Sequence, residues 1–209
     1  MEQAVREELE EAMLRELGEK GRAGLSPTEV LAEVGVSAEE FAETYGDLDG
    51  CLDAAYEHMT LRLDAAVRLG CAAGGQFHSS GAADWRARVW AGLESILVEL
   101  ADRPAEAQAL TRAYPALGPA QQARYQAFIE RLTWQLRTSR ETGGIDGGLP
   151  DSVDTLAVGA AEAIIFDEIS AGRTEGLAGM GGAILFSILV PYLGSAGAAA
   201  EMEKVRQSS

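Results

Sequence analysis

The chain has 209 residues, which is long enough to bury a sizeable core, and its two cysteines are too few for a disulfide framework. Its formal net charge of −16 favours solubility and cationic partners and opposes non-specific binding to nucleic acid. The acidity is concentrated at the start. Residues 1–60 hold 16 acids and 4 bases (4 − 16 = −12), whereas the remaining 149 residues hold 17 acids and 13 bases (13 − 17 = −4).

Two segments bear on the location of the protein. The first residues are acidic and lack the basic start and apolar stretch of a signal peptide, which predicts a cytoplasmic protein. Residues 176–200 carry no charge over a length that could span a bilayer. Several glycines, Pro191, and acidic flanks at Glu175 and Glu201 argue against a membrane helix, so we expect a buried helix at a protein interface.

Helical periodicity runs through nearly the whole chain, and no alternating run of β-branched residues occurs, so we predict an all-α fold. The first predicted helix covers residues 5–17 and ends at Gly18 and Gly21. The stretch Ser26-Pro27-Thr28-Glu29 predicts a capping box for the next helix, and replacing Ser26 by Ala should cost about 1 kcal/mol.

A third short helix should follow the turn at Gly35, because Ser37 can cap it with Glu40 at the third helical position. Together with the helix before it, this helix predicts a helix-turn-helix. The later helices are expected at residues 49–69, after an Asp84 cap, after Pro104, after Gly118-Pro119 as far as Thr142, and at residues 152–171 and 176–193. The stretch GGIDGGLPDS, residues 143–152, is the clearest linker, and the tail after Gly194 is expected to fray.

This order of elements resembles the TetR-like transcriptional regulators. The resemblance covers nearly the whole chain and is strongest in LSPTEVLAEVGVSAEEFAETYGDLDGCLDAAYEHM (25–59) and AGRTEGLAGMGGAILFSILVPYLG (171–194). It implies a homodimer with a helix-turn-helix domain at residues 1–47, a ligand-binding and dimerisation domain at 48–195 and a flexible tail at 196–209. It further implies operator DNA as a partner and a small effector that releases the DNA.

The recognition helix departs from the family pattern in its charges. The positions that the resemblance places against DNA are Ser37, Ala38, Glu39, Glu40, Ala42, Glu43, Thr44 and Leu48. Phosphate neutralisation by Lys and Arg supplies most non-specific affinity, and none of these eight residues is basic. A carboxylate about 4 Å from a phosphate adds repulsion of order 1 kcal/mol in bulk water. Glu39, Glu40 and Glu43 therefore suit a solvated helix start, with a basic protein partner or a cytosine contact as alternatives.

The resemblance to TetR-like regulators places several aromatic side chains on helices that surround an effector cavity, with plain core packing as the alternative. The candidates for the pocket are Trp85, Trp90, Arg124, Phe128, Arg131, Trp134, Glu162 and Phe166, which would select a flat or apolar effector. Small residues on the last two helices allow close helix approach and suggest a dimer interface. The candidates for the interface are Ala157, Ala160, Ala161, Gly179, Gly182, Ala183 and Phe186.

Neither a metal site nor an active site is expected. Cys51 and His58, like Cys71 and His78, lie two helical turns apart, whereas zinc ligands come in close pairs, so both cysteines are assigned to the core. The adjacent Asp167 and Glu168 diverge on a helix and do not form a catalytic pair. Asp151 and Asp154 are assigned to the cap region of their helix, and no cofactor is predicted.

The sequence thus predicts a TetR-like homodimeric regulator with a small-molecule pocket and weak or unusual DNA binding. The alternative is a ligand-binding or protein-interaction module of the same fold that has lost DNA binding. Neither alternative involves catalysis.

Overall fold

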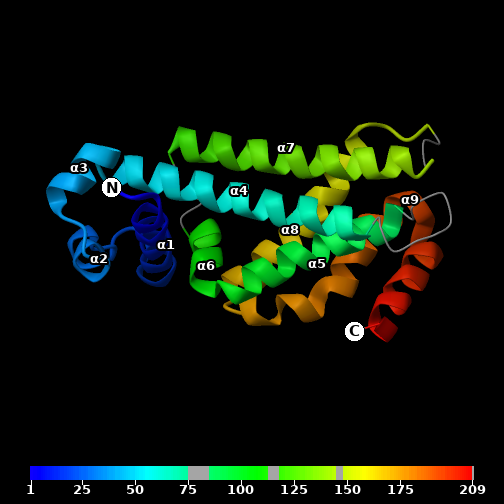
Figure 1. The fold of residues 1–209 in the computed structure, drawn as a ribbon. Helices are drawn as coiled ribbons and strands as arrows, with labels where there is room; N and C mark the ends of the chain where they lie inside the picture. Colours follow the sequence, from blue (N-terminus) through cyan, green and yellow to red (C-terminus); the bar gives the residue numbers. More distant parts are fainter. Residues whose placement is uncertain (75–84, 113–117, 145–147, 209) are drawn as a thin grey trace. The chain divides into compact units, whose positions relative to one another are not determined.

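The structure of the protein is a computed structural model that describes residues 1–74, 85–112, 118–144 and 148–208. These residues form nine α-helices and one 3₁₀ turn and contain no strand, which confirms the predicted all-α class (Figure 1). The expected cap Asp84, the loop residue His78 and linker residues 145–147 lie outside the described residues.

The chain divides into two compact units, each built from two segments. Unit 1 comprises Met1–Arg62 with Arg103–Gln126, and unit 2 comprises Leu63–Asp102 with Ala127–Ser209. The expected domain bounds at residues 47 and 195 come from a different criterion, the order of motifs along the sequence, and stay predictions.

Unit 1 holds the three N-terminal helices and a later helix that packs on the first of them. These are α1 (Gln3–Lys20), α2 (Pro27–Val34), α3 (Ala38–Tyr45) and α6 (Pro104–Arg112), with the start of α4 (Leu48–Gly74) and of α7 (Pro119–Thr142). Helix α1 lies beside α6 (Figure 1). A Cβ at Gly18 would lie 1.8 Å from the carbonyl oxygen of Ala105, so Gly18 permits this close contact. It lies inside α1 and does not end it, contrary to expectation.

The two predicted helix caps differ in the structure. Ser37 accepts a hydrogen bond from the Glu40 backbone N–H at 3.1 Å, and the Glu40 carboxylate accepts one from the Ser37 backbone N–H, so the predicted capping box is complete. Ser26 occupies the cap position of α2 but makes no such bond. The Glu29 carboxylate pairs with Lys20 instead, at 3.2 Å, so the capping box predicted at Ser26 is wrong.

Unit 2 is a helical bundle. Besides the rest of α4 and α7 it contains α5 (Trp85–Asp102), α8 (Ser152–Ser170), the 3₁₀ turn η2 (Thr174–Gly176) and α9 (Leu177–Ser208). Helix α9 packs against both α5 and α8 and buries Ile184, Leu185 and Leu189. These apolar contacts give unit 2 its own core.

The end of the chain is helical. Helix α9 kinks at Gly194, whose φ of 67° is accessible to glycine, and the helix resumes as far as Ser208. Ala198 is fully buried, and the Glu201 carboxylate forms an ion pair with Arg86 of α5, with Oε1 3.0 Å from Nη1. The segment expected to fray after Gly194 is thus helical as far as Ser208, and Ala198 and Glu201 pack within unit 2.

One segment, Thr174–Lys204, is long and apolar enough to span a membrane by composition. Only 33% of its most apolar window is buried in this fold. Core helices of globular proteins meet the same criterion, and the segment is broken by the kink at Gly194, so its composition alone is weak evidence for a membrane span.

Candidate ligand-binding cavity

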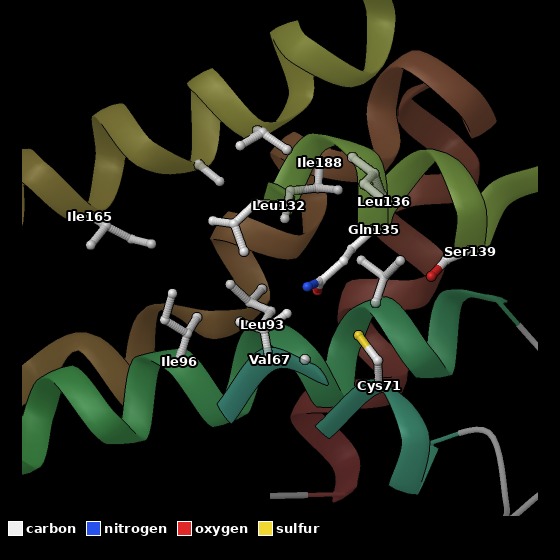
Figure 2. A pocket seen from close by; sticks show the side chains of 14 residues that line it. Val67, Cys71, Leu93, Ile96, Leu132, Gln135, Leu136, Ser139, Ile165 and Ile188 are labelled. Carbon is white, nitrogen blue, oxygen red and sulfur yellow. The ribbon is translucent and has the colours of Figure 1, made fainter. Parts of the chain in front are cut away.

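Unit 2 contains a cavity of about 110 Å³ between its helices (Figure 2). Helices α4, α5, α7, α8 and α9 all contribute to its wall. The lining residues are Val67, Cys71, Val89, Gly92, Leu93, Ile96, Leu132, Gln135, Leu136, Ser139, Val158, Ala161, Ile165 and Ile188. The wall is apolar apart from a few groups, which is the usual composition of a small-molecule site.

Cys71 belongs to the apolar part of this wall. Burial raises the pKa of the Cys71 thiol and outweighs the opposing effect of Arg88, so the thiol stays protonated at neutral pH. A Cβ at Gly92 would lie 2.6 Å from the Cys71 sulfur, so Gly92 lets α5 approach α4 here. Cys71 therefore acts as a small apolar side chain and not as a nucleophile.

Two polar side chains of α7 face the cavity, Gln135 and Ser139, and their spacing of four residues places them on one side of the helix. The Gln135 amide nitrogen donates to the Asp64 carboxylate at 3.0 Å. Asp64 is itself buried and is held by Arg68 at 3.1 Å. The orientation of the Gln135 amide is thereby fixed, with its nitrogen toward Asp64.

A buried ion cluster joins α7 to α8 one helical turn from Leu136 and Val158 of the cavity wall. Asp154 is 0% exposed and accepts hydrogen bonds from Arg140 and Arg137 at 3.1 Å and from the Tyr192 hydroxyl at 2.7 Å. Asp154 thus lies in the first turn of α8, in the predicted cap region, and its carboxylate binds these three side chains. Asp151 does occupy the cap position of α8, without a side-chain cap bond.

These partners control the ionisation of the cluster. Burial opposes the charge on Asp154, but hydrogen bonds from Arg140, Tyr192 and Arg137 outweigh it and hold the pKa of this carboxyl below its ordinary value. Burial and the bond to Asp154 raise the pKa of Tyr192, so its hydroxyl remains a donor. The cluster fixes one end of α7 against α8 and α9.

None of the eight side chains predicted to line a pocket lies in the wall of this cavity. Trp85 is buried edge-on against Tyr192, with ring centroids 5.5 Å apart, and Trp90 lies over Gly181. Phe128 is buried beneath Arg131, whereas Trp134 is 65% exposed. Arg124 pairs with Glu57 in unit 1 at 2.5 Å.

Glu162 and Phe166, the remaining two predicted pocket residues, border a shallow hollow whose six lining residues all come from α8. A hollow along one helix is open surface and not an enclosed site. The eight side chains are therefore dispersed over unit 2 and one position of unit 1.

The predicted interface residues fall into two groups. Ala157 and Ala161 are buried within unit 2, and Ala161 lines the cavity. The others are exposed or half-buried on α8 and α9: Ala160, Gly179, Gly182, Ala183 and Phe186. A Cβ at Gly179 would meet nothing within 4 Å, so the absence of a side chain there is not explained by packing within the chain.

The predicted DNA-facing residues lie at the cap of α3, along α3 and at the first residue of α4. Ser37, Ala38, Glu39, Glu40, Ala42 and Glu43 are exposed, and Thr44 and Leu48 are half-buried. Phe41 points into unit 1, where it packs 5.5 Å from the Tyr45 ring. The exposed surface of α3 is thus acidic or apolar.

The basic residues of unit 1 are largely paired with acids of the same unit. Of the five Lys and Arg residues in positions 1–62, four form ion pairs: Arg15 with Glu33, Lys20 with Glu16 and Glu29, Arg22 with Asp49, and Arg62 with Glu11 and Glu106. Each exposed pair stabilises the fold little, but a paired cation is less available to a phosphate.

Sequence reasoning missed the cavity residues Gln135 and Ser139. The signal was present in α7, where Leu132, Gln135, Leu136 and Ser139 recur at helical spacing, so that two polar residues share an otherwise apolar stripe. The search for aromatic residues favoured Trp134, one position away, which faces outward.

Comparisons of the chain with protein-family models, with curated proteins and with solved structures find no match.

Proposed function

We propose that this chain is a TetR-like homodimeric regulator of the cytoplasm that binds a small apolar effector and contacts operator DNA only weakly. The observation that carries the proposal is the cavity of unit 2, because five helices line an apolar space with polar groups on one side. The proposal assigns no catalytic activity to the chain and no cofactor.

The arrangement of α2 and α3 supports the regulatory part of the proposal. Gly35 has a left-handed φ of 78° and turns the chain between the two helices, and the Ser37 capping box starts the second of them. A short glycine-containing turn between two short helices is the geometry of a helix-turn-helix. The division into a helix-turn-helix domain and a larger ligand and dimerisation domain belongs to this proposal.

A thermal-shift screen of small apolar compounds tests the effector site. Ligand that binds only the folded state raises the melting temperature. A matched variant is Ala161→Phe, because Ala161 is buried in the cavity wall and a ring there would fill the space. Compounds should stabilise the wild type and not this variant. Equal stabilisation of both proteins, or of neither, contradicts an effector site in this cavity.

A second candidate function is a ligand-binding or protein-interaction module of this fold that no longer binds DNA. It is favoured by the exposed Glu39 and Glu43 on α3 and by the ion-paired bases of unit 1. Both candidates share the cavity, so they are separated by DNA binding and not by ligand binding. A basic partner protein at the acidic surface of α3 would fit this second candidate.

A further inference from the structure

Gln135 lines the cavity, and its amide oxygen is a hydrogen-bond acceptor without a donor among the described residues. Its nitrogen is committed to Asp64 at 3.0 Å, so its oxygen points elsewhere. The oxygen is buried, and no donor among the described residues lies within hydrogen-bonding distance of it. Figure 2 shows this amide pointing in among the labelled apolar side chains. Buried acceptors are rarely left unpaired in folded proteins, because the unmade bond is costly.

From this geometry we propose that the effector is a compact, neutral molecule that donates one hydrogen bond to Gln135 Oε1 and buries an apolar body against Leu93, Ile96 and Ile188. The inference rests on the proposed effector site and specifies its ligand class.

The size of the cavity limits the ligand. A dry apolar cavity of about 150 Å³ in another protein holds benzene, so a space of about 110 Å³ admits at most a single small ring or a branched aliphatic group. Larger molecules would require the helices to separate.

The polarity of the wall limits the ligand further. Among the residues that the structure describes, no Lys, Arg or His lines the cavity to pair with an anion, and no carboxylate lines it to pair with a cation. Burying an ion without a partner is strongly unfavourable, so the ligand is neutral. The two polar side chains of the wall, Gln135 and Ser139, both come from α7, whereas α5, α8 and α9 contribute apolar side chains. A ligand with one polar end therefore matches this wall.

Phenol and fluorobenzene form a suitable pair of probes, because they differ in a hydroxyl and a fluorine of similar size and only phenol donates a hydrogen bond. Binding to the full chain is measured by ligand-observed NMR titration. The wild type should bind both probes. Gln135→Met removes the acceptor and keeps the length of the side chain, so phenol binding should weaken about tenfold relative to fluorobenzene binding. Gln126→Met makes the same change at an exposed position of α7 and should leave the ratio unchanged.

The outcomes separate the two proposals. If neither probe binds the wild type, the effector site itself is contradicted. If both bind but Gln135→Met leaves their ratio unchanged, or if the ratio changes only in Ser139→Ala, the site stands and the role of Gln135 is overturned. Should Gln135→Met fail to fold, the wild type gives the test: phenol should bind it more tightly than fluorobenzene does, and equal binding of the two probes overturns the inference.

Discussion

Arg140 and Asp154 form a buried, two-bond ion pair between α7 and α8. Nε and Nη2 of Arg140 lie 3.1 Å from the two carboxylate oxygens of Asp154, and the side chains are 3% and 0% exposed. The Tyr192 hydroxyl donates to the same carboxylate from α9. A single carboxylate therefore connects three of the five helices that line the cavity.

Removing one partner of this pair should destabilise the protein severely. Asp154→Ala leaves Arg140 buried with an uncompensated charge, and we expect the free energy of unfolding to fall by about 3–5 kcal/mol. Urea denaturation measures this loss. Glu203→Ala is the control, because it breaks an exposed i, i+3 pair with Arg206 and should cost at most about 0.5 kcal/mol. Similar losses in the two variants contradict the structural role of Asp154.

The same carboxylate should make stability depend on pH in the acid range. The pKa of Asp154 is lowered in the folded state, so its contribution is complete above the unfolded pKa of about 4 and disappears as pH falls through the lower folded value. Denaturation of the wild type and Asp154→Asn should therefore show a stability difference at about pH 6 that shrinks toward about pH 2. A difference that is constant over this range contradicts the lowered pKa.

The caps of α2 and α3 should respond differently to substitution. Ser37→Ala removes a hydrogen bond to the Glu40 backbone and should cost about 1 kcal/mol of stability. Ser26→Ala should cost much less than we expected from the sequence, because the Ser26 hydroxyl caps no backbone N–H. Chemical denaturation of the two variants checks the order. Equal losses would show that Ser26 also caps its helix.

Substitutions on the exposed face of α8 should weaken dimerisation but leave the fold of the monomer unchanged. Leu156 is 69% exposed, so Leu156→Asp should leave the secondary structure intact but shift the proposed homodimer to monomer in sedimentation experiments. Leu69→Asp is the matched control, since Leu69 is 72% exposed on α4. If Leu156→Asp remains as dimeric as the control, the proposed interface is elsewhere.

The sequence predicted the helices well because helical periodicity, proline and glycine act locally. It indicated α2, the turn at Gly35, the Ser37 cap and the start of α7 at Pro119. It could not show that Gly18 sits within α1, because the reason is a carbonyl of Ala105 brought close by folding. Local signals placed Asp154 at the start of α8 but could not show its partners, which lie 14 and 38 residues away.

The candidate site was harder to predict than the fold. Aromatic content favoured Trp85, Trp90 and Trp134, but the side on which a helix faces the cavity depends on its packing against other helices. The distinctive feature of Gln135 depends on a bond from its nitrogen to Asp64, 71 residues earlier, which leaves its oxygen buried without a donor among the described residues. Such pairings are set by tertiary structure.

Charge reversal on α3 tests whether the acidic side chains of this helix weaken DNA binding. Glu39 and Glu43 are exposed, whereas Glu40 belongs to the capping box, so the informative variant is Glu39→Arg with Glu43→Arg. Glu94→Arg with Glu130→Arg changes the net charge equally at exposed positions of unit 2. Reversal on α3 should raise non-specific DNA affinity more than reversal in unit 2, because only α3 is proposed to face the phosphates. Equal effects would indicate that net charge alone governs binding.

The central claim is that the protein has the fold of a regulator but binds DNA weakly. Its most direct test is an electrophoretic mobility-shift assay of the wild type at low salt with its own upstream DNA. Electrostatic attraction is strongest under these conditions. We predict at most a weak shift that added salt abolishes, and a clear gain in the Glu39→Arg, Glu43→Arg variant. A tight wild-type complex that survives physiological salt would contradict the claim.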